Sequence, residues 1–167
     1  DLSMGVETVD YVTKGYSVTL LTLYLLGLSI ALINQKIDRT TAQNKVKELA
    51  DIIEMIPNII AKSIEYFDKY QDSFKKCNRL SCIGYGSNYG IAKEFETKFT
   101  ETVRRPSSGF ELEAYMHGPY LEANENHLTV FIEDSSAVSK RSKQLRKYME
   151  EINEVNNMLK NMDIDDI

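Results

Sequence analysis

The segment 91–103 carries ionisable side chains whose spacing could support acid–base chemistry. Glu94, Lys98 and Glu101 fall at positions i, i+4 and i+7, which places them on one row of a helix. If that row faces a cleft, Lys98 would keep a carboxylate ionised and ready to accept a proton from carbon. If it faces solvent, the same residues form surface ion pairs worth about 0.2 to 0.5 kcal/mol each. The spacing alone leaves both interpretations open.

A histidine follows further along the chain, in the sequence EAYMHGPY. His117 precedes a Gly-Pro pair that cannot continue a helix, so we expect it at a helix end. An imidazole in that position titrates near neutral pH and can transfer protons. The alternative is an ordinary loop histidine without a chemical role.

The stretch IGYGSNYGIAKEF, which begins at Ile83, joins an apolar run to a helical pattern through two glycines. Gly84 and Gly86 allow a tight turn, and the first N–H groups of the following helix favour an anion. Tyr89 stands where a dinucleotide fingerprint has its third glycine, and no Lys-Ser/Thr pair follows as in a nucleotide P-loop. The pattern predicts either a plain strand-to-helix turn or a turn that binds a small phosphorylated or hydroxylated ligand.

These residues need a framework, and the sequence predicts alternating strands and helices. Residues 78–84 and 128–134 are short apolar runs typical of buried strands. A helix is expected from residue 86 to about 105, where RPSSG ends the pattern. A second, long amphipathic helix is expected after Ser135 or Ser136, either of which could be its N-cap. Strand, helix, strand, helix is the order of a parallel α/β sheet. Only two of its strands are evident from the sequence.

The N-terminal part of the chain is predicted to be helical. Residues 18–33 are strongly apolar but fall short of the roughly 20 residues that a membrane span needs, so we expect a helix packed on two faces and no membrane contact. Residues 40–70 alternate charged and apolar side chains at helical spacing. Pro57 is expected to break or kink this second helix near Ile56.

The composition is that of an ordinary globular chain. The 167 residues are 43% hydrophobic and 27% charged, and the net charge of -5 argues against nucleic acid as a partner. Cys77 and Cys82 do not form a C-x-x-C motif, and with only two histidines no zinc site is expected. We infer a reducing, cytoplasmic environment and no metal.

Together these residues resemble a known family. The sequence IGYGSNYGIAKEFETKFTETVRRPSSGFELEAYMHGP is similar to the second sugar isomerase (SIS) domain of the isomerase part of glucosamine-6-phosphate synthase and its relatives, the phosphosugar isomerases and fructosamine-6-phosphate deglycases. The stretch GVETVDYVTKGYSVTLLTLYLLGL is similar to the end of the first SIS domain, so the resemblance covers about residues 3 to 150. The family pattern falls without a gap on Gly84, Gly86, Tyr89, Ala92, Glu94, Lys98, Glu101 and His117-Gly118-Pro119.

The resemblance implies aldose–ketose or amino-sugar chemistry on a sugar 6-phosphate, through an enediol or enolamine intermediate. Glu101 would be the base that moves a proton between C1 and C2, and His117 would assist ring opening. Lys98 would tune Glu101 and steady the developing oxyanion. No metal or organic cofactor is implied. The residues expected to bind the ligand are Gly84, Gly86, Ser87, Asn88, Tyr89 and Glu113.

The chain departs from the family pattern at both ends. The serine/threonine-rich phosphate clamp of the first SIS domain has no counterpart in this sequence, and neither do the last strands of the second domain. Two stretches could replace the clamp, namely the N–H groups of residues 87–89 and the arginines and serines of RRPSSG. The arginines have the alternative role of a solvated helix end.

We therefore predict a helix-rich α/β fold that contains part of a SIS-type parallel sheet flanked by helices and is incomplete. Residues 1–40 would end a first SIS domain, residues 41–76 would form a helical connector, and residues 77–167 would begin a second SIS domain. A sheet of two or three strands leaves an edge exposed. We accordingly expect a fragment or remnant that forms a homodimer.

Three functions fit this sequence. The first is a phosphosugar isomerase or deglycase, of which the chain holds part of the catalytic apparatus. The alternative is a non-catalytic sugar-phosphate-binding or regulatory SIS module, and the third is a purely structural helical protein. A buried Glu101 that faces a pocket would favour the enzyme, an exposed Glu101 paired only with Lys98 or Arg105 would favour the module, and fewer than three parallel strands would favour the structural protein.

Overall fold

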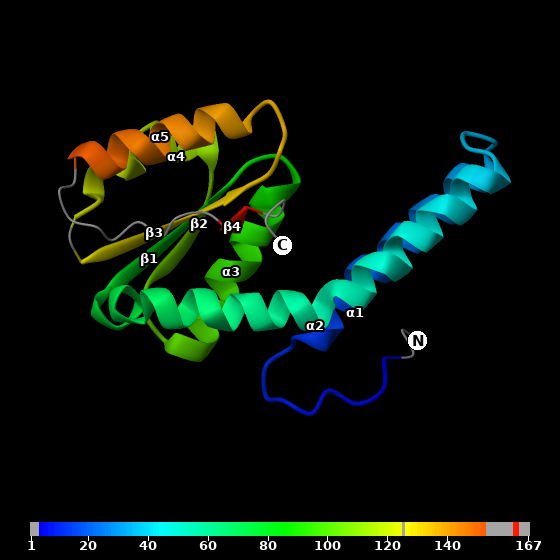
Figure 1. The fold of residues 1–167 in the computed structure, drawn as a ribbon, viewed down its shortest axis with the longest axis horizontal. Helices are drawn as coiled ribbons and strands as arrows, with labels where there is room; N and C mark the ends of the chain where they lie inside the picture. The colour runs from blue at the N-terminus through cyan, green and yellow to red at the C-terminus, as the bar shows by residue number, and fades with distance from the viewer. Residues whose placement is uncertain (1–3, 125, 153–161, 164–167) are drawn as a thin grey trace. The chain divides into compact units, whose positions relative to one another are not determined.

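The computed structural model describes residues 4–124, 126–152 and 162–163. The chain forms two compact units, Asp1–Ile60 and Ala61–Ile167. The first unit contains helix α1 and the beginning of α2, and the second contains the end of α2 and every later element (Figure 1). The candidate chemistry therefore belongs to the second unit.

Helix α1 (Lys14–Ile33) exposes its apolar side chains. Only Gly15 is buried, while Leu23, Leu26 and Ile30 are each at least half exposed. The prediction of a helix packed on two faces is therefore wrong for the described residues, because the described part of the first unit offers only the segment before α1 and the start of α2 to cover a helix that is apolar all round. By length and composition α1 could also cross a membrane, but core helices of soluble proteins and signal sequences share these properties. The absence of membrane contact stays a prediction.

Helix α2 (Arg39–Lys76) continues through Pro57 without interruption. Its first turn is capped by Asp38, whose Oδ1 accepts a hydrogen bond of 2.7 Å from the Thr41 N–H. The predicted break at the proline does not occur, because a proline removes one N–H donor and the neighbouring turns keep theirs. The other predicted outcome, a kink near Ile56, stays a prediction.

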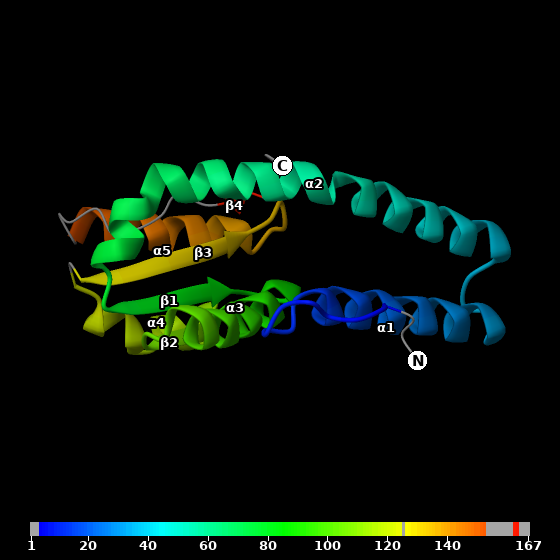
Figure 2. The same ribbon diagram turned by 90° about the horizontal axis from the view of Figure 1, so that it is seen from below.

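The second unit is built on a parallel sheet in the order β2-β1-β3-β4. Leu80 of the central strand β1 is in register with Ser107 on one side and with Leu128 on the other. Figure 2 shows the arrows of β1 and β3 running in the same direction. The strands are β1 (Arg79–Gly84), β2 (Ser107–Glu111), β3 (His127–Glu133) and the two-residue β4 (Met162–Asp163). The α/β fold with a parallel sheet flanked by helices is confirmed, and its three longer strands do not meet the condition that would have favoured a purely structural helical protein.

Strand β2 was not predicted, because its sequence SSGFE has few residues that favour strands. It pairs with β1 on one side only. On the other side, the Gly109 N–H donates to Glu96 Oε2 at 2.6 Å, so helix α3 (Ser87–Val103) satisfies part of the free edge. Ser107 adds a bond from its Oγ to the Glu96 carbonyl oxygen at 2.8 Å.

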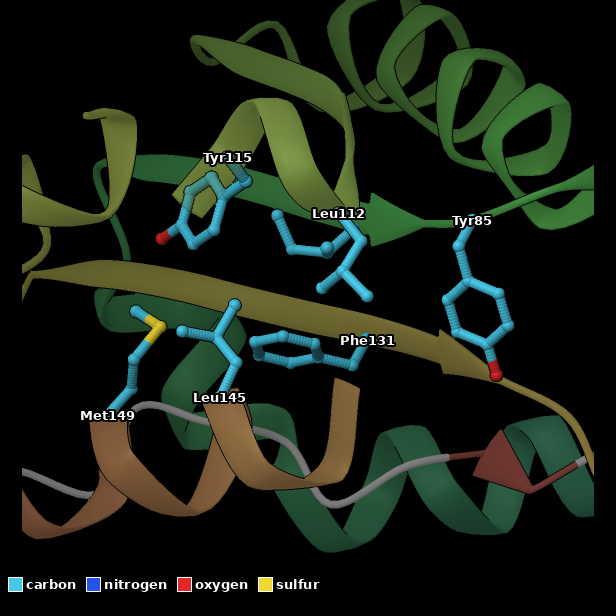
Figure 3. Packing of buried hydrophobic residues seen from close by; sticks show 7 residues of the cluster. Tyr85, Leu112, Tyr115, Phe131, Leu145 and Met149 are labelled. Carbon is cyan, nitrogen blue, oxygen red and sulfur yellow. The ribbon is translucent and has the colours of Figure 1, made fainter. Parts of the chain in front are cut away.

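Helices cover both faces of this sheet. Leu80 and Cys82 of β1 pack with Ala92 and Phe99 of α3 and with aromatic residues at the end of α2. The other face packs against α4 (Leu112–Met116) and α5 (Ser139–Ile152), as Figure 1 shows. Figure 3 shows the side chains of this second cluster, which include Tyr85, Leu112, Tyr115, Phe131, Leu145 and Met149.

Helix α5 begins later than predicted. Its first residue is Ser139, and neither Ser135 nor Ser136 is its cap. Asp134 accepts a hydrogen bond of 2.9 Å from the Ser136 N–H and holds these residues in a turn before the helix. The predicted continuation over residues 153–161 lies outside the described residues.

Candidate functional site

The glycine turn joins the carboxyl end of β1 to the first residue of α3. Gly86 has φ of 53°, a left-handed conformation that favours glycine. A Cβ atom on Gly84 would lie 2.2 Å from the Asn88 carbonyl oxygen, so no side chain fits there. The Asn88 N–H donates to the Tyr85 carbonyl oxygen at 2.9 Å, and the Tyr89 N–H donates to that of Gly86 at 3.3 Å. Two of the three N–H groups expected to hold an anion are therefore used within the turn.

Asp134, which directly follows β3, connects this turn to the neighbouring strand. Its Oδ1 accepts from the Tyr85 hydroxyl at 2.9 Å, and its Oδ2 accepts from Asn88 Nδ2 at 3.0 Å. Hydrogen bonds from Ser136, and after it from Tyr85 and Asn88, hold the pKa of Asp134 below its ordinary value. Asn88 is buried, and its side-chain amide donates the hydrogen bond to Asp134. The sequence analysis missed the roles of Tyr85 and Asp134, although an aspartate at the end of a parallel strand was the available signal.

The ionisable row on α3 forms as its spacing predicts. Lys98 Nζ lies 2.9 Å from Glu101 Oε2 and 3.7 Å from Glu94 Oε1. The hydrogen bond to Glu101 raises the pKa of Lys98, so the lysine stays cationic beside both carboxylates. The Glu101 side chain is 41% exposed. This combination of exposure and pairing with Lys98 is the one expected of the non-catalytic module.

The remaining predicted residues lie apart from this row. His117 is the exposed C-cap of α4, and Glu113 forms an ion pair with Arg141 of α5, with one N–O distance of 2.8 Å. Within the described residues, no hydrogen bond or ion pair joins His117 or Glu113 to the α3 row. Ser87 and Tyr89 are exposed at the start of α3. The roles assigned to these residues stay predictions.

The second stretch expected to hold an anion, RRPSSG, is engaged in the fold. Arg104 ends α3 in a left-handed conformation, and Arg105 Nη1 donates to the carbonyl oxygens of Lys75, at 3.2 Å, and of Cys77. Ser107 belongs to β2 and binds the Glu96 carbonyl oxygen. The described part of the chain contains no group of three or more His, Cys, Asp or Glu side chains that could hold a metal ion.

Comparison with known proteins finds a family match and several relatives. The family model of the SIS domain matches residues 73–159. The glutamine–fructose-6-phosphate aminotransferase (isomerizing) of Cyanidium caldarium is 27% identical over 137 residues, which are 80% of this chain and 22% of that protein. The protein of the same name from Thermotoga maritima is 29% identical over 118 residues, 71% of this chain and 19% of its own length. The chain thus spans about a fifth of these curated relatives.

Solved structures show the same fold. An inferred phosphosugar isomerase from Clostridium difficile 630 superimposes with a TM-score of 0.85 and 25% identity, over 94% of this chain and 44% of that chain. The C-terminal domain of glucosamine-fructose-6-phosphate aminotransferase from Francisella tularensis gives a TM-score of 0.81 at 20% identity, over 88% of this chain and 41% of its own. The family match covers more than half of the sequence, and the fold agrees with it. The chain therefore belongs to the SIS domain family.

Proposed function

We propose that this chain supplies part of the sugar-phosphate site of a phosphosugar isomerase or deglycase. The observation that carries the proposal is the α3 row, where Lys98 lies within 3.7 Å of Glu94 and within 2.9 Å of Glu101. The family match and the isomerising relatives support a sugar 6-phosphate or amino-sugar 6-phosphate as the ligand. Because the chain spans only part of those relatives, the activity of the whole protein belongs to the proposal as well.

In the proposed reaction, Glu101 removes a proton from C2 or C1 of the open-chain sugar. The electron pair of the broken C–H bond forms the double bond of an enediol or enolamine, and the carbonyl oxygen or imine nitrogen takes up a proton from solvent. Glu101 then returns its proton to the other carbon, while the hydroxyl or amine on the first carbon releases a proton to solvent and becomes the new carbonyl or imine. The isomerisation therefore needs no oxidant and no cofactor. Lys98 holds Glu101 ionised before the first step and stabilises the negative charge on the sugar oxygen. His117 assists ring opening, and the glycine turn and Glu113 bind the ligand.

A second function is favoured by one specific observation. Glu101 is 41% exposed and forms an ion pair with Lys98, whereas a base that removes a proton from carbon works best in a site that excludes water. A non-catalytic sugar-phosphate-binding or regulatory module would tolerate this exposure.

Proton exchange separates the two functions. Fructose 6-phosphate is incubated with the chain in D₂O, and deuterium at C1 is followed by NMR. An isomerase site exchanges this proton, and Glu101→Gln slows the exchange by about 10²- to 10⁴-fold; Glu54→Gln, on an exposed residue of α2, is the control. Binding is measured in parallel by thermal shift, where a hundredfold excess over the dissociation constant adds about 2.7 kcal/mol of stability. Binding without exchange identifies the module, and absence of binding contradicts both functions.

The proposal also includes a homodimer in the cytoplasm, without nucleic acid or membrane as a partner. The exposed apolar residues of α1, such as Leu23 and Leu26, would favour self-association. Size-exclusion chromatography with light scattering should give a mass well above 19.1 kDa. A stable monomer at micromolar concentration would contradict the dimer.

A further inference from the structure

A crevice of about 340 Å³ is lined by helix α5 and by the segment that follows β2. That segment contains the last residue of α4 and the 3-10 helix η1 (Pro119–Glu122), and it contributes Met116 and Tyr120. Helix α5 contributes residues spaced by three or four positions, which share one row of a helix: Arg141, Gln144, Leu145 and Tyr148. The volume lies within the range of about 300 to 1,000 Å³ that small-molecule sites occupy.

The surface of this crevice is largely apolar and aromatic. Leu145 is 6% exposed and belongs to the core cluster against which Met116 and Tyr120 pack, and Figure 3 shows its side chain directed from α5 toward the sheet. The rings of Tyr120 and Tyr148 meet edge to face with their centroids 6.5 Å apart. Tyr148 is 47% exposed, so its ring is accessible to a further aromatic ring. A planar apolar group is therefore the part of a ligand that this surface would accept.

Arg141 places an oriented cation at the rim of the crevice. Its Nε contacts Glu113 Oε1, and its Nη2 donates to Glu113 Oε2 at 2.8 Å. This two-point contact fixes the plane of the guanidinium group, which carries five N–H donors in a rigid fork. Within the described residues, Nη1 of Arg141 has no acceptor. The edge formed by Nη1 and Nη2 is therefore available for a carboxylate, which matches it with two parallel hydrogen bonds.

The charge balance at the crevice favours an anion with a single charge. Among the described residues that line it, Arg141 carries the only charge, and Gln144 is a neutral donor and acceptor. The Glu113 carboxylate beside Arg141 compensates much of that positive charge. A dianionic phosphate would be repelled by Glu113 without meeting a second cation, whereas a carboxylate meets less repulsion.

We propose that this crevice binds a small molecule in which a carboxylate is joined to an aromatic ring by a short linker. The molecule is either a simple aryl acid or an aromatic amino acid. The free edge of Arg141 would hold the carboxylate, and the ring would lie on Tyr148 and Leu145. Glu113 would orient Arg141, and it would also attract the ammonium group if the ligand is an amino acid.

The proposed site is separate from the α3 row. Helix α3 packs in the core cluster on one face of the sheet, and α5 packs in the cluster on the other face. Of the residues assigned to the sugar-phosphate site, Glu113 is shared, and its contact with Arg141 is the one that the structure shows. The inference therefore stands independently of the proposed catalysis by Glu101.

Titrations with 3-phenylpropionate and with phenylalanine test the site. Backbone amide shifts are followed by NMR at constant ionic strength, and acetate and benzyl alcohol serve as ligands that carry only the carboxylate or only the ring. We expect saturable shifts at residues 116–120 and 141–148 with at least one of the two complete ligands, and an affinity at least about tenfold weaker for either half. Tighter binding of phenylalanine would identify an amino acid as the ligand, and equal or tighter binding of 3-phenylpropionate would identify a simple aryl acid. Absence of saturable shifts at these residues would overturn the proposal.

Two substitutions separate the contribution of the cation from that of the ring. Arg141→Gln and Tyr148→Ala should each weaken the binding of the tighter ligand about tenfold, whereas Tyr148→Phe keeps the ring and should keep the affinity. Because both side chains are exposed, the unfolding midpoint should change little. Arg104→Gln, which removes an exposed arginine at the end of α3, is the charge-matched control and should bind as the original chain does. Unchanged affinity in Arg141→Gln or in Tyr148→Ala would overturn the proposal.

A competition experiment distinguishes this site from the proposed sugar-phosphate site. Fructose 6-phosphate is added before the aryl ligand, and the affinity for the aryl ligand should stay the same. Displacement of the aryl ligand by fructose 6-phosphate would overturn the inference, because the crevice would then belong to the sugar-phosphate site. Failure of fructose 6-phosphate to bind at all would contradict the proposed function and leave the aryl site supported by its own titration.

Discussion

The Tyr85 hydroxyl donates a hydrogen bond to Asp134 Oδ1 and accepts one from the Asp134 backbone N–H, both at 2.9 Å. The two residues are 49 positions apart in the sequence, and each follows the last residue of its strand. Figure 3 shows the Tyr85 ring beside the carboxyl end of β3. This reciprocal pair ties together the carboxyl ends of β1 and β3, beside the glycine turn that begins α3.

Tyr85→Phe should lower the free energy of unfolding of the second unit by about 1 to 3 kcal/mol. The substitution keeps the ring in its cluster but leaves the Asp134 N–H and carboxylate without one partner each. Chemical denaturation followed by circular dichroism measures the change. Tyr89→Phe removes the hydroxyl of a tyrosine that is 39% exposed and should change stability by less than about 0.5 kcal/mol. Equal effects of the two substitutions would show that the Tyr85–Asp134 pair contributes little.

Gly84→Ala should destabilise the chain, while Gly90→Ala should stabilise it. An added Cβ at Gly84 meets the Asn88 carbonyl oxygen at 2.2 Å, whereas one at Gly90 meets no atom within 4 Å. We expect a loss of about 1 to 3 kcal/mol at Gly84 from overpacking and a gain of about 0.5 to 1 kcal/mol at Gly90 from the better helix former. Thermal unfolding measures both. A tolerated alanine at Gly84 would mean that the turn relaxes away from β1.

Stability should fall as the pH drops below about 5. Hydrogen bonds, first from Ser136, lower the pKa of Asp134. Burial acts to raise the pKa of Glu96, but hydrogen bonds from Lys93 and from the Gly109 N–H lower it overall. A carboxylate whose pKa is lower in the folded state contributes stability that is complete above its unfolded pKa of about 4 and is lost as the pH falls through the folded value.

Unfolding midpoints measured between pH 7 and pH 3 test this expectation. Asp134→Asn should flatten the pH dependence, because the substituted amide does not titrate. Asp51→Asn, on an exposed residue of α2, should leave the profile unchanged. If Asp134→Asn keeps the full acid sensitivity of the original chain, the Asp134 carboxylate is not responsible for it.

Neither cysteine should react in the folded chain. Cys77 and Cys82 are free thiols with 1% and 0% exposure, and burial raises the pKa of Cys82 to about 12 and that of Cys77 in the same direction. Since the thiolate is the reactive form and both thiols are buried, labelling by a disulfide reagent at pH 8 should be much slower than in denaturant. Rapid labelling of the native chain would show that the α3 face of the sheet opens.

The features of this protein that could be predicted from its sequence are those set by local patterns. The strands β1 and β3, the helix α3 and the Glu94–Lys98–Glu101 row depend on periodicity and on neighbours within two turns. The SIS domain resemblance rested on the same local segments, and the family match confirms it. The division into residues 1–40, 41–76 and 77–167 and the roles of the site residues stay predictions.

Contacts between distant residues decided the rest. Strand β2 forms because β1 pairs with SSGFE and Glu96 of α3 accepts the Gly109 N–H at its free edge, which no local propensity indicates. The exposure of α1 depends on what else in its unit could cover it. The Tyr85–Asp134 pair likewise depends on the parallel pairing that brings the ends of β1 and β3 together. The sequence alone determined β1, β3, α3 and the candidate residues on them, and the tertiary structure decided the remaining elements and which residues lie together, because a site is made by the packing of segments far apart in the chain.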